Sequence, residues 1–156
     1  MALVSVCIPV FNGEKYIKDS IESVLGQTNK DFELIIVDNC STDSTYDIVS
    51  AYDDPRIRVF RNDQNIGSIG NFNRCIELSK GDYFVLLPHD DILLPTMLDT
   101  FSNAFDSDAV LGLAYSSYYI IDEDGEKTDL RVVATVDKVM SGEEALKAFL
   151  LQGNPI

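Results

Sequence analysis

The sequence predicts an α/β fold with a mainly parallel sheet flanked by helices, and three observations lead to it. Three runs, at residues 3–10, 32–38 and 82–87, are almost continuously apolar, as is typical of strands buried on both faces. Segments with apolar residues at helical spacing separate these runs. Strand and helix patterns alternate at least three times, which is the order expected when helices connect parallel strands.

The first of these strands is followed by a predicted helix over residues 13–25. Apolar residues recur there at helical spacing, namely Ile17, Ile21, Val24 and Leu25. Asn12 is the predicted cap that begins the helix, and Gly26 is the residue that ends it. The strand at 32–38 is followed by "STDST", which supplies caps and a first-turn acid for a helix running to about Tyr52.

The middle of the chain continues the alternation of strand and helix. Residues 56–60 alternate between apolar and polar, which predicts a shorter strand. A polar loop then leads to a helix with one apolar face, made of Phe72, Cys75 and Ile76. After the strand at 82–87, Pro95 opens a helix whose inward residues are Met97, Leu98, Phe101 and Phe105.

The last part of the chain predicts a hairpin and a final helix. Residues 111–121 are predicted as a longer strand, and 129–136 as its hairpin partner. The turn "DEDG" at 122–125 has acids like those of a calcium loop, but their spacing departs from an EF-hand, so we interpret it as a hairpin turn. Ser141 and Glu144 form a capping box before the helix.

Length and composition favour an ordinary globular protein. With 156 residues, of which 46% are hydrophobic and 24% charged, we predict a single domain over residues 1–156. No apolar run approaches the roughly 20 residues that span a bilayer, and no secretory signal precedes the first strand, so we expect a cytoplasmic protein. The three cysteines, Cys7, Cys40 and Cys75, form no C-x-x-C pair and are predicted to be free thiols.

The net charge of -14 argues against nucleic acid as a partner, because a phosphate backbone would be repelled. A smaller ligand that carries phosphate needs local neutralisation. A divalent cation held by aspartate carboxylates would provide it.

Polar side chains gather where three predicted strands end, the edge at which open parallel sheets bind ligands. They are Asn12, Glu14, Asp38, Asn39, Asp90 and Asp91. Each group also has a structural explanation: Asp38 suits a turn before a helix, the 90–91 pair suits a solvated turn, and Asn12 and Glu14 suit a helix start. The coincidence of three groups at one edge favours a ligand site.

Three segments resemble, in this order, the amino-terminal half of a family 2 glycosyltransferase with the GT-A fold. They are "VSVCIPVFNGEKYIKDSIESVLGQT", "FELIIVDNCSTDST" and "NIGSIGNFNRCIELSKGDYFVLLPHDDILLP". The likeness is close over about residues 3–100 and looser to the end. It implies a Rossmann-like GT-A sheet and transfer of a sugar, with inversion, from a nucleoside diphosphate sugar, most often a UDP-sugar, to an acceptor hydroxyl. It also implies a role in polysaccharide biosynthesis and cell wall biogenesis.

The resemblance implies that several residues bind the nucleotide. Pro9, Val10 and Phe11 correspond to the platform under the base, and the ring of Phe11 suits a base π-face. Asp38 corresponds to the acid that contacts the base. The full implied set is Pro9, Val10, Phe11, Glu14, Asp38, Asn39 and Asp90. Asn39 stands where the family often has a second Asp, and Cys40 where Gly is common.

The family's acidic metal motif, D-x-D followed by D, corresponds to residues 88–91. Pro88 replaces the first carboxylate. The implied ligands of Mg²⁺ or Mn²⁺ are Asp90 and Asp91, and either one of them or both would hold the cation. Such a cation stabilises the charge of a departing nucleoside diphosphate and removes the repulsion between neighbouring acids. His89 is interpreted as a packing or supporting residue, because no second His and no Cys lies at metal-ligand spacing from it in the sequence.

An inverting transferase needs a general base for the acceptor hydroxyl, and the resemblance places it beyond Ile156. We therefore expect no catalytic residue within this chain, which we interpret as a donor-binding half truncated at the C-terminus. The acceptor, a saccharide or a lipid-linked saccharide, is not identified. A second half would pack against apolar surface of this chain, and that surface, when exposed, predicts a homodimer. We also expect a full-length protein to lie at the inner face of the membrane.

Other α/β classes fit the sequence less well. A receiver-like regulatory domain carries its acid pair after the first strand, where this chain has "PVFN". A nucleotidyltransferase carries a Gly-rich, basic loop there, and "PVFNGEKY" is not such a loop. The remaining alternative is a catalytically silent nucleotide-binding or scaffolding relative, which Pro88 favours.

Overall fold

The computed structural model describes residues 3–108, 111–132 and 141–144. The chain divides into two compact units, Met1–Asp106 and Ser107–Ile156, and each is described by itself. The single domain expected over residues 1–156 stays a prediction.

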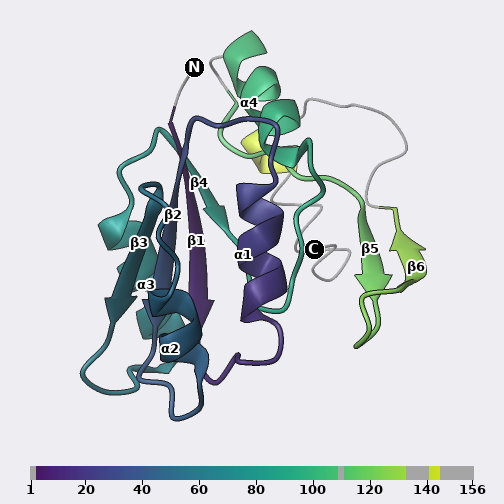
Figure 1. Ribbon diagram of the computed structural model, residues 1–156. Coiled ribbons are helices and arrows are strands. Elements are labelled where there is room, and N and C mark those ends of the chain that lie inside the picture. The colour runs from purple at the N-terminus through teal and green to yellow at the C-terminus, as the bar shows by residue number, and fades with distance from the viewer. Residues whose placement is uncertain (1–2, 109–110, 133–140, 145–156) are drawn as a thin grey trace. The chain divides into compact units, whose positions relative to one another are not determined.

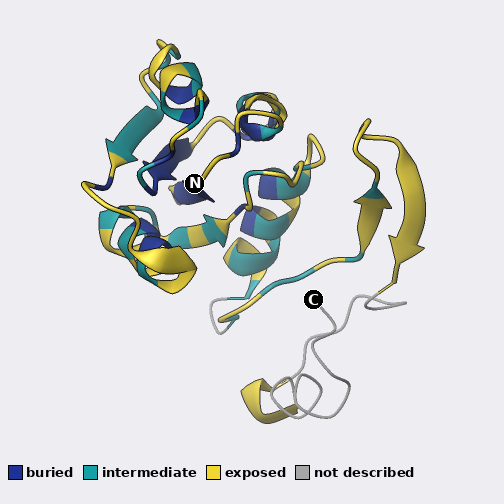
Figure 2. Cartoon of the chain, turned by 90° about the horizontal axis from the view of Figure 1, so that it is seen from below, coloured by how far each residue is buried: buried dark blue, intermediate teal, exposed yellow. Residues whose placement is uncertain are grey.

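A four-stranded sheet forms the centre of the first unit (Figure 1). Its strand order is β3-β2-β1-β4, and every neighbouring pair is parallel. The strands are β1 (Val4–Val10), β2 (Phe32–Asp38), β3 (Ile57–Arg61) and β4 (Tyr83–Leu86). Every residue of β1 and β2 is buried, as their continuous apolar runs predict (Figure 2). The predicted parallel α/β sheet is confirmed.

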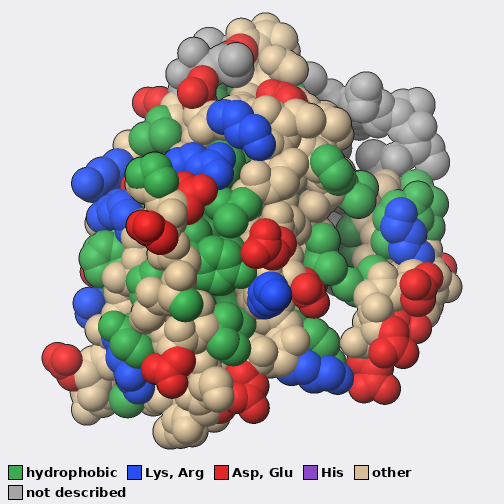
Figure 3. Space-filling view, viewed as in Figure 1, with side chains coloured by type: hydrophobic (Ala, Val, Ile, Leu, Met, Phe, Trp, Pro, Cys, Tyr) green, Lys and Arg blue, Asp and Glu red, His purple; other side chains and the backbone are tan. Residues whose placement is uncertain are grey.

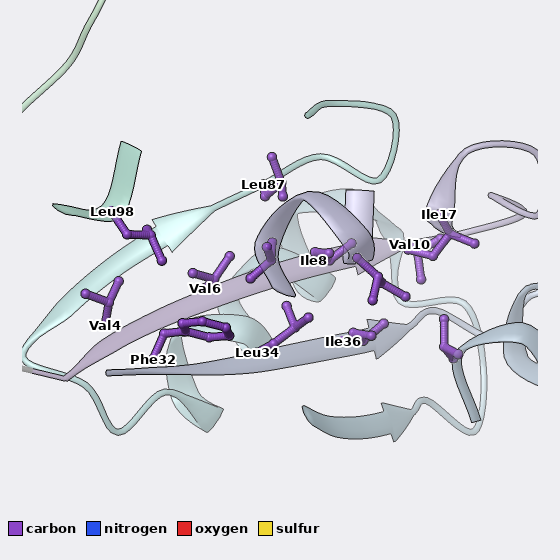
Figure 4. Packing of buried hydrophobic residues seen from close by; sticks show 13 residues of the cluster. Val4, Val6, Ile8, Val10, Ile17, Phe32, Leu34, Ile36, Leu87 and Leu98 are labelled. Atoms are coloured by element: carbon purple, nitrogen blue, oxygen red, sulfur yellow. The ribbon is translucent and has the colours of Figure 1, made fainter. Parts of the chain in front are cut away.

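Helices pack on both faces of this sheet. They are α1 (Ile17–Leu25), α2 (Thr45–Ser50), α3 (Gly67–Leu78) and α4 (Met97–Ser107). One face forms the larger core, where alternate side chains of β1 and β2 meet α1 and Leu98 of α4 (Figure 4). On the other face Cys7, Ile35 and Val37 pack against Cys75 of α3. The three cysteines all lie in residues 3–108 and are free thiols, as predicted.

The start of α1 differs from the prediction. The helix begins at Ile17, and within the described residues its cap position, Tyr16, makes no side-chain capping hydrogen bond. Asn12 is not a cap: it has a φ of 53°, and its Oδ1 accepts the N–H of Thr42 at 2.8 Å. A partner 30 residues away in sequence has replaced the local capping bond. Gly26 ends the helix as predicted.

The inward face of α3 also differs from the prediction. Cys75 is buried, but Phe72 and Ile76 are 39% and 58% exposed. The sheet-facing position belongs instead to Asn71, whose Nδ2 donates to the carbonyl of Val37 at 2.9 Å. A polar side chain is favoured there because it satisfies a backbone carbonyl at the end of a buried strand. In α4, Leu98 is buried and Met97 packs against the core, as predicted.

The second unit contains a hairpin of β5 (Tyr118–Ile121) and β6 (Lys127–Arg131), which pair antiparallel. The interpretation of 122–125 as its turn is confirmed, since the N–H of Gly125 donates to the carbonyl of Asp122 at 3.1 Å. Acidic side chains gather over this turn (Figure 3). The longer strand predicted over 111–121 is wrong for 111–117. These residues pair with no strand among those described, and ladder hydrogen bonds are what define a strand.

The capping box is present at the start of the last predicted helix. The N–H of Glu144 donates to Ser141 Oγ at 3.2 Å, and the N–H of Ser141 donates to Glu144 Oε2 at 2.9 Å. The rest of that helix, and residues 133–136 of the predicted hairpin strand, lie outside the described residues. Over the described ranges, no helix combines the length and apolar character needed to cross a bilayer.

Candidate functional site

The candidate site lies at the carboxyl ends of β1, β2 and β4. Val10 and Asp38, the last residues of β1 and β2, are paired in register. Leu86 of β4 pairs with Cys7, and the N–H of Leu87 donates to the carbonyl of Cys7 at 2.9 Å. The chain after β4 therefore runs along the last part of β1, and residues 88–91 reach the edge where β1 and β2 end. The three predicted groups of polar residues come to one edge of the sheet.

Reciprocal hydrogen bonds join the loops that follow β1 and β2. Side chains after β2 accept backbone N–H groups after β1, and side chains after β1 accept N–H groups after β2. The pairs are Asn12 N–H to Ser41 Oγ (2.9 Å), Gly13 N–H to Thr45 Oγ1 (2.8 Å), Thr42 N–H to Asn12 Oδ1 (2.8 Å) and Ser44 N–H to Glu14 Oε2 (2.9 Å). These bonds hold the two loops in a fixed relation.

Phe11 and its two predecessors have different environments. Phe11 is 43% exposed, whereas Pro9 and Val10 are buried within β1. The side chain of Val10 belongs to the core under α1, and its carbonyl accepts the N–H of Asn39 at 2.8 Å. Of the three residues expected under a base, Phe11 alone presents an exposed ring. Contact between any of them and a base stays a prediction.

Asp38 is fully buried, and its carboxylate already has partners within the chain. Arg61 Nε lies 3.2 Å from Asp38 Oδ2, and the N–H of Ser41 donates to Asp38 Oδ1 at 3.2 Å. The guanidinium of Arg61 in turn lies over the ring of Tyr46, 4.5 Å from its centroid. The bond to Ser41 matches the turn-forming role that the sequence offers for Asp38. Contact with a base stays a prediction for this residue too.

A network of asparagines surrounds the residue after Asp38. Asn39 Oδ1 accepts the Nδ2 of Asn62 at 2.8 Å and the N–H of Ile66 at 3.0 Å, while Asn39 Nδ2 donates to Asn65 Oδ1 at 2.9 Å. Asn62 Nδ2 also donates to Asn71 Oδ1 at 2.9 Å. An amide at position 39 can both donate and accept, which a carboxylate cannot do. Asn therefore suits this position, although the sequence pattern did not indicate the network.

The acidic pair carries like charges on adjacent residues. Partial burial raises the pKa of Asp91 above its ordinary value, the charge of Asp90 raises it further, and His89 partly opposes this shift. A divalent cation would relieve this repulsion. Within residues 3–108, 111–132 and 141–144, no three His, Cys, Asp or Glu side chains converge to hold a metal. Two carboxylates nevertheless fit Mg²⁺, which takes many of its ligands from phosphates and water.

His89 joins the acidic loop to the loop after β1. A Cβ built on Gly13 would lie 2.5 Å from His89 Cδ2, so the imidazole ring rests directly against the Gly13 backbone. This contact agrees with the packing role interpreted from the sequence.

We expect the substitution Gly13→Ala to lower the free energy of unfolding by about 1–3 kcal/mol, because the added methyl group overpacks the site. The new Cβ would meet His89 Cδ2 and, at 2.7 Å, Val10 Cγ2. Urea unfolding followed by circular dichroism measures the loss. The same substitution made in the variant His89→Ala should cost less stability, since only the Val10 contact remains. A loss of the same size with and without His89 would show that the ring is not the obstacle.

Comparison with known proteins agrees with this arrangement of strands and loops. Residues 5–153 match the family model described as Glycosyl transferase family 2. The chain belongs to glycosyl transferase family 2. The teichuronic acid biosynthesis protein TuaG of Bacillus subtilis, a putative glycosyltransferase, is 33% identical over 151 residues, which are 96% of this chain and 59% of that protein.

A second family 2 relative is WfaP of Escherichia coli, a UDP-Glc:alpha-D-GlcNAc-diphosphoundecaprenol beta-1,3-glucosyltransferase. It is 36% identical over 120 residues, which are 77% of this chain and 47% of that protein. The chain spans about half the length of these two curated relatives.

The fold of this family 2 chain resembles that of a solved structure, residues 1–349 of Staphylococcus aureus TarS. The TM-score is 0.64 at 28% sequence identity, and the match covers 68% of this chain and 33% of the TarS chain. Together with the parallel sheet, this match confirms the GT-A fold that the sequence resemblance implies.

Proposed function

We propose that this chain is the donor-binding part of a glycosyltransferase that transfers a sugar from a UDP-sugar to an acceptor hydroxyl, with metal assistance and inversion. The observation that carries the proposal is that the segments with Phe11, Asp38 and the 90–91 acid pair follow neighbouring parallel strands at one sheet edge in a family 2 chain, with His89 against Gly13. Open parallel sheets bind nucleotides at this edge.

In this proposal the loops after β1 and β2 bind the nucleoside. The exposed ring of Phe11 offers a π-face to the base. Asp38 ends the neighbouring strand β2 and is paired with Arg61, and Asn39 follows it within the asparagine network. The full proposed set is the one implied by the sequence: Pro9, Val10, Phe11, Glu14, Asp38, Asn39 and Asp90. The reciprocal hydrogen bonds between the loops after β1 and β2 preorganise the site, which lowers the entropic cost of binding.

Asp90 and Asp91 would hold Mg²⁺ or Mn²⁺ beside the diphosphate. The bound cation would supply a Lewis acid that stabilises the charge of the departing nucleoside diphosphate. The two carboxylates must be ionised to act as ligands. Because the chain has a net charge of -14, an anionic donor depends on this local neutralisation rather than on a general electrostatic attraction.

The relatives support the choice of donor and the class of acceptor. WfaP is named for UDP-Glc as donor and for a diphosphoundecaprenol-linked sugar as acceptor, and TuaG for teichuronic acid biosynthesis. We therefore infer a UDP-sugar donor, a saccharide or lipid-linked acceptor, and a role in polysaccharide or cell wall synthesis. The general base for the acceptor hydroxyl is proposed to lie beyond Ile156. The predicted homodimer remains an expectation.

Isothermal titration of the folded chain with UDP, in Mn²⁺ and in EDTA, tests the proposal. We expect saturable heat in Mn²⁺ and much weaker binding in EDTA, with UDP preferred over dTDP and GDP. No heat at millimolar UDP in a folded sample would contradict donor binding. A longer protein that binds UDP in Mn²⁺ but transfers no sugar from a panel of UDP-sugars would instead favour the catalytically silent relative.

A further inference from the structure

The segment between Leu87 and Met97, which contains the acidic pair, has no helix or strand of its own. A turn bond from the N–H of Asp91 to the carbonyl of Pro88 at 3.1 Å holds part of its backbone, and side chains from elsewhere bond to other backbone groups. Polar side chains of α1 and of the residues just after it provide many of these contacts, although the helical pattern of that segment suggested only an apolar face. Two of these polar side chains, Ser20 and Ser23, lie three residues apart on one side of the helix, and a third, Gln27, follows just after its end.

Ser20 contacts the acidic loop itself. Its side chain is 1% exposed, and its Oγ lies 2.7 Å from the carbonyl of His89 and 2.8 Å from the carbonyl of Asp91. These two carbonyls flank Asp90, so one hydroxyl holds the backbone on both sides of that residue. A hydroxyl has a single proton to donate, and the two carbonyls share it.

Ser23 and Gln27 contact the connection that follows. The N–H of Leu93 donates to Ser23 Oγ at 3.1 Å. Gln27 is fully buried; its Nε2 donates to the carbonyl of Leu94 at 2.8 Å, and its Oε1 accepts the N–H of Leu98 at 3.0 Å. These contacts attach the start of α4 and the residues before it to α1 and the residue after its cap, and they do not reach residues 89–91.

Burying a hydroxyl on a helix stabilises nothing by itself, because the group must be desolvated and then satisfied. Among the residues that the structure describes, the Oγ of Ser20 finds its hydrogen-bond partners in the acidic loop, so its bonds help to specify where that loop lies. We propose that Ser20 is a positioning residue that fixes the backbone of the 90–91 pair for cation binding, an inference that rests on the proposed donor site. Ser20 acts through the carbonyls of His89 and Asp91 and does not touch the cation or the donor.

The test compares the variant Ser20→Ala with the unaltered chain by titration of UDP in Mn²⁺ and in EDTA. Residues that orient metal ligands typically change metal affinity 10- to 100-fold. We expect the ratio of the two UDP affinities to fall by about ten-fold or more, with the affinity in EDTA unchanged. Ser23→Ala is the matched control: it removes a neighbouring hydroxyl of the same helix face and should keep the ratio. Circular dichroism confirms that each variant is folded.

A purely structural role would lower stability and leave this ratio unchanged, and that result would overturn the inference. An equal loss of affinity in Mn²⁺ and in EDTA would overturn it too. If Ser20→Ala does not fold, Ser20→Cys keeps the size of the side chain and removes the strong donor, and the same ratio decides. If the unaltered chain shows no dependence on Mn²⁺, both this inference and the metal-assisted function fail. If the unaltered chain binds UDP more tightly in Mn²⁺ and Ser20→Ala keeps the same ratio of affinities, this inference alone fails.

Discussion

Asp91→Asn is expected to remove the Mn²⁺-dependent part of UDP binding, lowering affinity in Mn²⁺ by on the order of 100-fold, since even residues that only orient metal ligands contribute 10- to 100-fold. The amide that replaces the carboxylate is a neutral and much weaker ligand for a hard cation. With two acids in the pair, the loss of one removes half of the charge that the protein offers. Affinity in EDTA should stay unchanged, because the nucleoside contacts lie in the loops after β1 and β2. Titration calorimetry with and without Mn²⁺ measures both quantities.

The control for Asp91→Asn is Asp53→Asn, which makes the same charge change at an exposed acid between α2 and β3. It should bind UDP like the unaltered chain in both buffers. Asp90→Asn shows whether one carboxylate or both are needed, the alternative that the sequence leaves open. If Asp91→Asn and Asp90→Asn both keep the full Mn²⁺ effect, the pair is a solvated turn and holds no metal.

The same site should respond to pH in a definite direction. Burial and the charge of Asp90 raise the pKa of Asp91, so this carboxyl takes up a proton at a higher pH than an ordinary aspartate does. Proton and cation compete for the ionised form. The Mn²⁺-dependent part of UDP binding should therefore weaken, as pH falls, earlier than the ordinary pKa of aspartate would suggest.

The first two strands and their ends could be predicted from sequence because local patterns carry the information. The continuously apolar runs of β1 and β2 match strands whose every residue is buried. Parallel strands end at one edge, so the polar residues after them had to gather there. The features that were missed depend on partners distant in sequence. Asn12 bonds Thr42 across two loops, and Ser20 bonds a loop about 70 residues later.

Residues whose type suits two environments were predicted least well. Asn71 occupies the sheet-facing side of α3 because a strand carbonyl needs a donor, a requirement that helical periodicity does not reveal. Phe72 and Ile76 are consequently left exposed on that helix. Ser20 in α1 and Gln27 just after it resemble solvent-facing residues in the sequence, yet both are buried. Hydrogen bonds to residues distant in sequence determine which of these side chains are buried, and a hydrophobicity pattern carries no information about such bonds.

Glu33→Ala is expected to lower the free energy of unfolding by about 1–3 kcal/mol, the usual cost of leaving buried hydrogen-bonding groups without their partner. Glu33 lies near the start of β2, at the end of the sheet opposite the candidate site, and is 9% exposed. Its Oε2 accepts Arg58 Nη1 at 2.7 Å, and its Oε1 accepts Ser5 Oγ at 2.6 Å and the N–H of Lys80 at 2.7 Å. One carboxylate thus ties β1, β2, β3 and the chain before β4 together.

The pH dependence of that stability has a definite sign. Burial alone would raise the pKa of Glu33, but the hydrogen bonds from Ser5, Arg58 and Lys80, with the charge of Arg58, outweigh it and lower the pKa below its ordinary value. A carboxylate with a lowered pKa stabilises the fold above the pKa of the unfolded chain, and this contribution is lost as pH falls through the folded value. The stability difference between the unaltered chain and Glu33→Gln should therefore shrink on acidification.

Urea unfolding at about pH 7 and about pH 3, followed by circular dichroism, measures this difference, and the pH range spans the ordinary carboxylate pKa. Glu77→Gln, at an exposed position of α3, is the matched control and should show little difference at either pH. Because Glu33 lies at the opposite end of the sheet, folded Glu33→Gln should keep its Mn²⁺-dependent binding of UDP. A stability difference that stays constant from neutral to acidic pH would mean that the ionised carboxylate does not hold these strands together.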